Sequence, residues 1–174
     1  MGGFCHYSVA CPRCGAVGKF LEYGDYERNH VSYAGGRVLD SRVRPCRIKC
    51  LSCLKTHALL PDTITPYSPY SLCFKLIVLI AYLERDVPVT AICDSFGIAV
   101  STLYEWKKIM LAQKDIMLGV LISRKTSALS FLKDMLNSGD ISGIIAEFFK
   151  QFNFSFMQVA SVTVAKSMNT PSPI

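Results

Sequence analysis

Apolar residues recur at helical spacing through most of the chain after residue 71, and this pattern predicts a series of helices. The longest apolar run, residues 72–83, indicates a buried helix that ends near Glu84 and is too short to cross a bilayer. Residues 128–136 are amphipathic, and the sequence NSGD at 137–140 indicates a helix end followed by a helix start. Residues 116–122 could either extend the preceding helix or break from it at Gly119.

A broad apolar face is predicted for the helix that follows residue 140. Its members keep helical spacing without interruption: Ile141, Ile144, Ile145, Phe148, Phe149 and Phe152. The face could pack into the core of its own chain. It could also form a homodimer interface through Ile141–Phe152, since it is wide for a small domain.

Residues 88–110, PVTAICDSFGIAVSTLYEWKKIM, predict two helices joined by a tight turn at Gly97. Glycine accepts positive φ there, and the small Cys93 lies where the two helices approach most closely. Apolar residues occupy the positions that must pack the helices together: Ile92, Phe96, Ile98, Leu103 and Trp106. This spacing is typical of a helix-turn-helix, which places its second helix in the DNA major groove. The alternative is an ordinary helical hairpin in an unrelated core.

The second of these helices, expected from about residue 99 to about residue 113, carries the candidate DNA contacts. With Leu103 and Trp106 turned inward, helical spacing turns Ser101, Tyr104, Glu105 and Lys108 outward. Hydroxyl groups at the helix start can cap the helix or reach a phosphate. The expected DNA-binding residues on this helix are Ser101, Thr102, Tyr104, Glu105, Lys107 and Lys108.

Two C-x2-C pairs, Cys11 with Cys14 and Cys50 with Cys53, are the main chemical signal in the sequence. Two such turns facing each other supply the four thiolates of a structural zinc site. A thioredoxin-type redox pair would need a helix that begins at Cys11, and the glycine directly after Cys14 argues against one. The sequence therefore predicts Zn²⁺ bound by Cys11, Cys14, Cys50 and Cys53.

Further cysteines and histidines surround this motif without a clear assignment. Cys5 and Cys46 could substitute as ligands, although free thiols are the favoured interpretation. The histidines at 6, 30 and 57 are isolated in the sequence and are interpreted as surface or core residues.

The residues between the cysteine pairs predict a β-rich module, and the fold class as a whole is α+β. Residues 20–33 and 37–49 read as strands on either side of an Ala-Gly-Gly turn. Pro61, Pro66 and Pro69 then exclude a continuous helix and favour an extended tether. The predicted organisation is a zinc ribbon at 1–57, a proline-rich linker at 58–71, a helix-turn-helix domain at 72–115 and a C-terminal helical extension at 116–174.

The composition and net charge indicate which kind of molecule the chain could bind. With 51% hydrophobic and 18% charged residues the chain is globular, and its formal net charge of +6 favours an acidic partner. Residues 42–55 contain basic side chains and no acid, which fits either a solvated surface or a strip that faces phosphates. The strip consists of Arg42, Arg44, Arg47 and Lys49. The start, MGGFCHYSVA, lacks the features of a signal peptide, so a cytoplasmic protein without membrane association is expected.

Three segments resemble the N-terminal DNA-binding part of bacterial insertion-sequence transposases and their short uncharacterised relatives. They are CPRCG at 11–15, RIKCLSCLKTHALLPDTITPY at 47–67 and the helix pair that contains STLYEW at 101–106. The resemblance covers residues 11–110 and implies that the four cysteines bind zinc and that residues 101–108 lie on DNA. Transposases of the common type also hold two metal ions with three acidic residues in a separate domain. Beyond the second helix this chain has only Asp115, Asp134, Asp140 and Glu147, so it is predicted not to cut DNA.

The sequence thus favours sequence-specific binding of double-stranded DNA by a transposase-like, catalytically inactive protein. It would belong to a mobile element or act as a transcriptional regulator, and no small-molecule substrate is expected. The alternative is a zinc-stabilised protein–protein interaction module with a helical dimerisation domain. A thiol redox protein is a weaker alternative.

Overall fold

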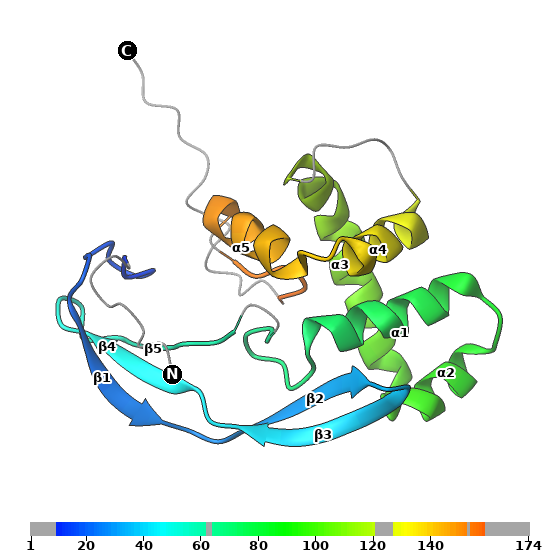
Figure 1. Cartoon of the computed structure of the whole chain (residues 1–174), viewed down its shortest axis with the longest axis horizontal. Coiled ribbons are helices and arrows are strands. Elements are labelled where there is room, and N and C mark those ends of the chain that lie inside the picture. The colour runs from blue at the N-terminus through cyan, green and yellow to red at the C-terminus, as the bar shows by residue number, and fades with distance from the viewer. Residues whose placement is uncertain (1–9, 62–63, 121–126, 153, 159–174) are drawn as a thin grey trace, which may run out of the picture.

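Antiparallel strands form a long curved ribbon that runs beneath the helices (Figure 1). The computed structural model describes residues 10–61, 64–120, 127–152 and 154–158. It pairs β4 (Cys46–Cys50) with both β1 (Phe20–Asp25) and β5 (Thr56–Ala58), whereas β2 (Arg28–Ala34) and β3 (Arg37–Val43) form a separate hairpin. Gly35 and Gly36 join β2 to β3 with φ values of 58° and 76°, as a tight two-residue turn requires. Strands on either side of this turn are confirmed, but each predicted segment is divided into two strands, at residues 26–27 and at residues 44–45, and the two halves belong to different sheets.

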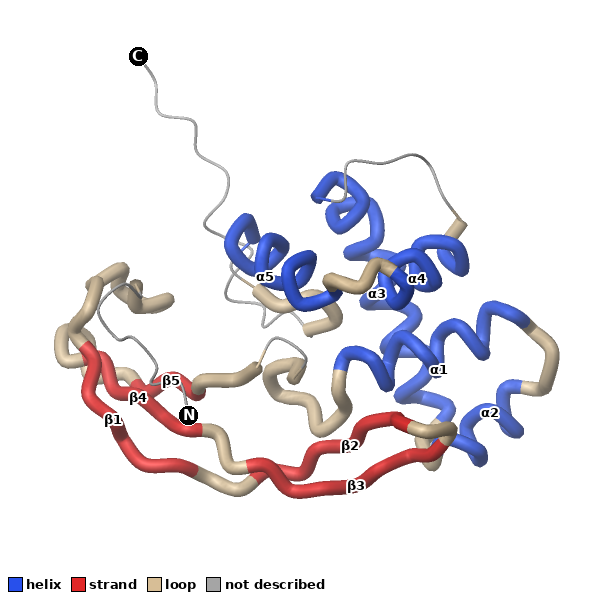
Figure 2. Tube along the Cα trace, viewed as in Figure 1, coloured by secondary structure: helices blue, strands red, loops and turns tan. Residues whose placement is uncertain are grey.

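Five helices follow the strands in the described part of the chain (Figure 2). They are α1 (Leu72–Glu84), α2 (Val89–Phe96), α3 (Val100–Val120), α4 (Ala128–Asn137) and α5 (Ile141–Phe152). Ser71 Oγ accepts a hydrogen bond from the Phe74 amide and caps α1, and Ser127 caps α4 in the same way. None of these helices is both long and apolar enough to cross a membrane. The α+β class, the helix at 72–84 and the interruption at 137–140 are therefore confirmed.

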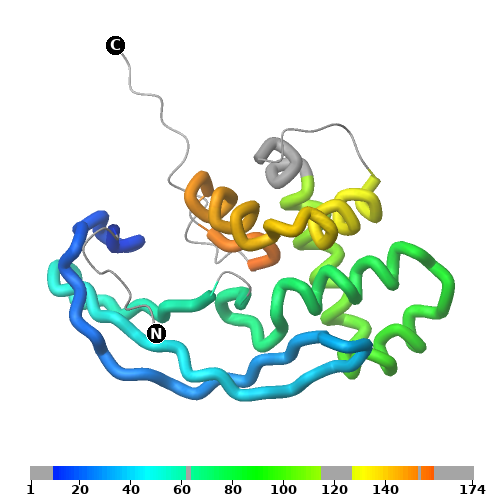
Figure 3. The backbone as a smooth tube through the Cα atoms, viewed as in Figure 1, coloured from blue at the N-terminus to red at the C-terminus, as the bar shows by residue number. Residues whose placement is uncertain are grey.

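The core lies where α1 meets the other helices, and Figure 3 traces the backbone through this region. Because α1 contacts α2, α3, α4 and strand β2, it is buried on most of its circumference. The buried side chains of the core are Leu72, Phe74, Leu76, Val78, Leu79, Ile92, Cys93, Ile98, Leu103, Trp106, Met110, Phe131, Leu132, Met135, Ile145, Phe148, Phe156 and Met157. The apolar run at 72–83 thus forms a buried helix, as predicted.

The apolar face of α5 packs largely within its own chain. Ile145 and Phe148 are buried, and three further members of the face pack partly against the core. The Phe148 ring lies 5.2 Å from the Phe154 ring and 5.7 Å from the Phe156 ring, so residues beyond α5 fold back over it. Phe149 is the exposed member of the face. A homodimer through Ile141–Phe152 stays a prediction.

The hairpin β2–β3 is fastened to the helical part through the segment before α1. The Val31 amide donates to the Pro69 carbonyl, and the Ser71 amide donates to the Val31 carbonyl, each at 2.8 Å. The Arg28 guanidinium donates to the carbonyls of Ser68 and Thr65. Residues 58–71 were expected to form an extended tether, but these bonds hold their second half in place. The division of the chain into modules at 57 and 71 stays a prediction.

Candidate metal centre and candidate nucleic-acid interface

Two turns of the same geometry carry the four predicted cysteine ligands. In the first turn the Gly15 amide donates to the Cys11 carbonyl and the Cys11 amide donates to the Ala16 carbonyl. The second turn repeats both bonds at the same spacing, from Leu54 to the Cys50 carbonyl and from Cys50 to the Lys55 carbonyl. Gly15 and Leu54 have φ values of 74° and 60°, so each turn ends in a left-handed residue. Each turn therefore directs two sulfurs to one side.

The strand pairing brings the two turns together. Phe20 lies opposite Cys50 in the β1–β4 ladder, which places the first turn beside the second. Cys11 Sγ lies 3.7 Å from Cys53 Sγ, and Cys14 Sγ lies 3.7 Å from Cys50 Sγ. All four sulfurs lie within 4.8 Å of one another. Thiolates about 2.3 Å from a tetrahedrally coordinated ion lie about 3.8 Å apart, so the four cysteines could hold one metal ion.

The thiols influence one another's ionisation. The Cys53 amide, helped by that of Ser52, outweighs desolvation and lowers the pKa of Cys50 to about 6. The Ala16 amide favours the Cys14 thiolate, but desolvation and the three neighbouring cysteines together raise the pKa of Cys14 to about 12. Four thiolates this close repel one another, and a bound cation would remove that repulsion.

His57 lies beside the cluster, a position that sequence reasoning missed. Its Nε2 atom is 3.3 Å from Cys11 Sγ, and its ring packs edge-on against Phe20. Burial lowers the pKa of His57, which favours the neutral ring. The Cys53-x3-His57 spacing was the available signal, because histidines this close to a metal-ligating cysteine often contact the site. Cys46 is outside the cluster, with its Sγ 3.6 Å from the Arg47 carbonyl, and Cys5 lies outside the described residues.

The α2 and α3 helices pack together through the residues that the sequence predicted. Gly97 ends α2 with φ 64°, and the Ile98 amide donates to the Cys93 carbonyl at 3.0 Å. Cys93 is 3% exposed, consistent with close approach of the two helices. Buried with it are Ile92, Ile98, Leu103 and Trp106, while Phe96 is partly buried.

The predicted DNA-contacting residues on α3 differ in their exposure and in their contacts with the rest of the chain. Ser101, Tyr104, Glu105 and Lys108 are exposed, as helical spacing predicted. Thr102 and Lys107 are half-buried. The Lys107 ammonium donates to the Tyr82 hydroxyl at 3.0 Å and lies over the rings of Tyr82 and Tyr104. The Lys107 ammonium therefore already has interaction partners within the chain.

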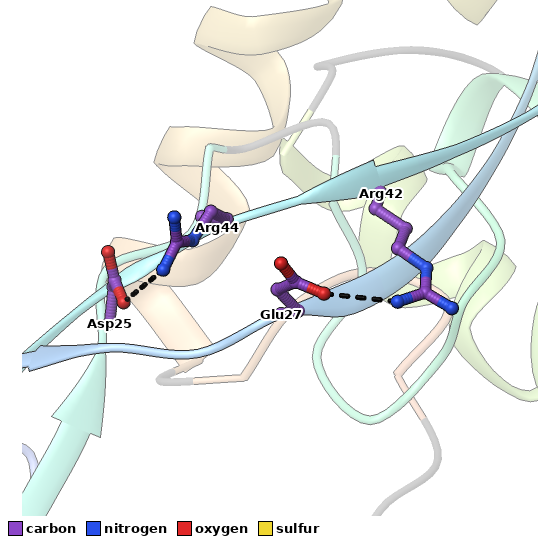
Figure 4. A network of polar contacts seen from close by, with 4 residues as sticks. All are labelled: Asp25, Glu27, Arg42 and Arg44. Atoms are coloured by element: carbon purple, nitrogen blue, oxygen red, sulfur yellow. Dashed lines mark hydrogen bonds and ion pairs between the residues drawn. The ribbon is translucent and has the colours of Figure 1, made fainter.

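Neighbouring carboxylates neutralise part of the positive charge of the basic strip (Arg42, Arg44, Arg47 and Lys49). Arg42 pairs with Glu27 at 3.0 Å, and Arg44 pairs with Asp25 at 3.3 Å (Figure 4). Such exposed pairs contribute about 0–1 kcal/mol, so a phosphate can replace the carboxylate at little cost.

The other two residues of the strip lie against aromatic rings. The Arg47 guanidinium is 5.8 Å from the Tyr23 ring and 5.6 Å from the Tyr26 ring, and the Lys49 ammonium is 5.3 Å from the Tyr23 ring. No hydrogen bond, ion pair or ring contact among the described residues joins this strip to the exposed face of α3. The structure thus brings the four cysteines together but leaves the two candidate DNA-contacting sets on separate elements.

Comparison with known proteins gives one result. A family model described as Domain of unknown function (DUF6431) matches residues 11–106, just over half of the 174 residues. The matched segment starts at the first cysteine of the cluster and ends at Trp106, on the buried side of α3. No curated protein and no solved structure matches the chain.

Proposed function

The chain belongs to the family described as Domain of unknown function (DUF6431), and within the matched residues we propose a zinc-stabilised unit that binds double-stranded DNA. The observation that carries the proposal is the α2–α3 pair. It combines a left-handed glycine turn with a buried contact face and an exposed polar face on α3. That combination is what a helix-turn-helix needs, because its second helix must be held firmly while its outer side chains enter the groove.

Zinc is the metal that best suits the cysteine cluster. Four thiolates in a closed tetrahedral arrangement are typical of structural zinc sites and of iron bound by sulfur. The four cysteines lie in two short turns next to strands that have few buried side chains. In small modules of this kind, zinc commonly supplies the stability that a hydrophobic core would otherwise provide. Cys11, Cys14, Cys50 and Cys53 would thus form a zinc ribbon that fixes β1 against β4.

On DNA, α3 would lie in the major groove with its first two turns against the bases. Ser101 and Lys108 could contact phosphate or guanine edges, and Glu105 could accept a hydrogen bond from cytosine N4. Tyr104 is 46% exposed and supplies apolar contact area for base edges or methyl groups. Arg42 and Arg44 would exchange their acidic partners for phosphates and add affinity without reading sequence.

The proposed protein recognises DNA without cutting it, either within a mobile element or as a transcriptional regulator. Two of the acidic residues beyond α3 have structural partners: Asp140 accepts a hydrogen bond from the Gly143 amide, and Glu147 pairs with Lys150 at 3.8 Å. These positions fit helix capping and surface pairing better than metal-dependent catalysis.

A protein–protein interaction module is the second candidate. It is favoured by the basic residues that are already engaged, since Arg42, Arg44 and Lys107 each have a partner within the chain. Phe149 also offers an exposed apolar side chain beside the ribbon, where it lines a surface pocket together with His57.

Selection from a pool of duplexes with random centres tests the proposal. The full zinc-loaded chain is expected to enrich a common sequence. Tyr104→Ala combined with Glu105→Ala should lower the affinity ratio between selected and scrambled duplexes at least about fivefold, since one good base contact contributes about 1–3 kcal/mol.

Glu147→Ala with Lys150→Ala is the matched control, because it removes two exposed side chains from α5 instead. If the ratio survives the α3 substitutions, α3 is not the reading helix. If no duplex binds at low salt, the interaction-module candidate replaces DNA binding.

A further inference from the structure

The tip of the β2–β3 hairpin is held next to the turn that leads into α3. Tyr33, near the end of β2, packs its ring 5.5 Å from the ring of Phe96, the last residue of α2. Four residues further along the chain α3 begins at Val100. Figure 1 shows the same arrangement, with the hairpin ending beside α2 at the opposite end of the ribbon from the cysteine turns.

This position is fixed at more than one point along the hairpin. Val31 bonds through its backbone to both Pro69 and Ser71, and Ser71 caps α1. Tyr33 belongs to the partly buried residues that pack against the helical core. The hairpin therefore cannot swing away from α2 without breaking core contacts.

The tip itself is open and carries an uncompensated cation. Around Gly35 and Gly36 no atom lies within 4 Å of the place a Cβ would occupy, so a ligand's backbone could approach closely. Arg37 lies opposite Ala34 in the β2–β3 ladder. Its side chain is therefore on the other face of the hairpin from that of Tyr33, and it is exposed. Within the described ranges the Arg37 side chain makes no hydrogen bond or ion pair, whereas Arg42 pairs with Glu27 and Arg44 pairs with Asp25.

We propose that this tip, residues 34–37, is a second DNA-contacting element, with Arg37 on a backbone phosphate beside the groove that α3 occupies. The inference rests on the proposed function. A helix with its side chains is about 10–12 Å across and fills a major groove about 12 Å wide, so an element beside the helix meets the flanking backbone. Ala34 is one residue beyond Tyr33, which is about 3.4 Å along the strand, so the tip lies close to the contact between Tyr33 and the end of α2. A flexible cation that lacks an acidic neighbour is suited to a phosphate.

The test compares Arg37→Ala, Arg37→Lys and the control Lys150→Ala in the full zinc-loaded chain, with the duplex obtained by selection. Losing one phosphate contact should reduce the slope of log affinity against log salt by about 0.9. Affinity at about 0.1 M salt should fall about eightfold for selected and scrambled duplexes alike. Arg37→Lys should keep the slope, Lys150→Ala should match the wild type, and the melting temperature should not change.

Phosphate ethylation interference locates the contact independently. One phosphate next to the α3 contacts should interfere with wild-type binding and not with Arg37→Ala. If the wild type binds DNA and Arg37→Ala leaves both slope and interference pattern unchanged, the hairpin inference is wrong and α3 recognition stands. If the wild type binds no DNA at low salt, the proposed function fails, and the hairpin contact with it.

Discussion

Replacing Lys75 by methionine is expected to stabilise the protein at neutral pH. Lys75 lies in α1 and is 2% exposed; its ammonium has one long hydrogen bond, 3.4 Å from the Met157 carbonyl, and lies 5.8 Å from the Trp106 ring. Desolvation, with a smaller effect from Arg28, lowers the pKa of Lys75 from 10.5 to about 7. At about 1.36 kcal/mol per pKa unit, the buried charge costs on the order of 5 kcal/mol.

The direction of the pH dependence follows from the lowered pKa. Between pH 7 and pH 10.5 the unfolded chain keeps its proton on this amine while the folded chain has lost it, so stability rises with pH in that window. Below pH 7 both states are protonated and the whole cost is present. Methionine has a similar shape and no charge, so Lys75→Met should gain a few kcal/mol at pH 6–7 and lose that advantage towards pH 10.

Urea unfolding at several pH values from 6 to 10 measures this difference. Thiols and tyrosines that titrate in the same range affect wild type and variant equally and cancel in the comparison. Lys150→Met is the matched control, because that lysine is 79% exposed and should give no pH-dependent difference. A variant less stable than wild type at pH 7, or a difference that stays constant from pH 7 to pH 10, would refute the reasoning.

Two further predictions concern the metal centre and the helix turn. Cys50→Ser should reduce bound zinc to well below one equivalent by elemental analysis and disorder the ribbon, whereas Cys46→Ser should keep the metal because its sulfur lies outside the cluster. Gly97→Ala should destabilise the chain by about 1 kcal/mol in urea unfolding, since alanine is strained at φ 64°. Gly97→Asn should cost less, because asparagine tolerates this conformation; equal costs would contradict the argument from backbone strain.

Local patterns in the sequence were sufficient for much of the fold. The apolar run after Ser71, the glycine at 97 and the NSGD sequence at 137–140 each act within a few residues, and the helices begin and end where they indicate. The cluster of four cysteines was also predictable, because C-x2-C spacing by itself creates a turn that directs two sulfurs to the same side.

Features that depend on contacts between different strands could not be predicted from local sequence patterns. His57 reaches Cys11 only because the three-residue strand β5 pairs with β4. Arg42 and Arg44 appeared free in a stretch without acids, yet Arg42 pairs with Glu27, just before β2, and Arg44 pairs with Asp25, at the end of β1.

The apolar face of α5 shows the same effect at the level of packing. Its width suggested a dimer interface, and Phe154 and Phe156 fold back to cover much of it. In each of these cases contacts outside the helix or strand repeat decide the outcome, and single-sequence periodicity carries no information about such contacts.

The most direct test of the account is the affinity of the full zinc-loaded chain for double-stranded DNA as a function of salt concentration. Binding through α3, Arg42, Arg44 and Arg37 predicts measurable binding at about 50 mM salt. It also predicts a slope of log affinity against log salt steeper than about −2, because each phosphate contact contributes about −0.9. Folded, zinc-loaded protein that shows no salt-dependent binding to any duplex would contradict the central claim.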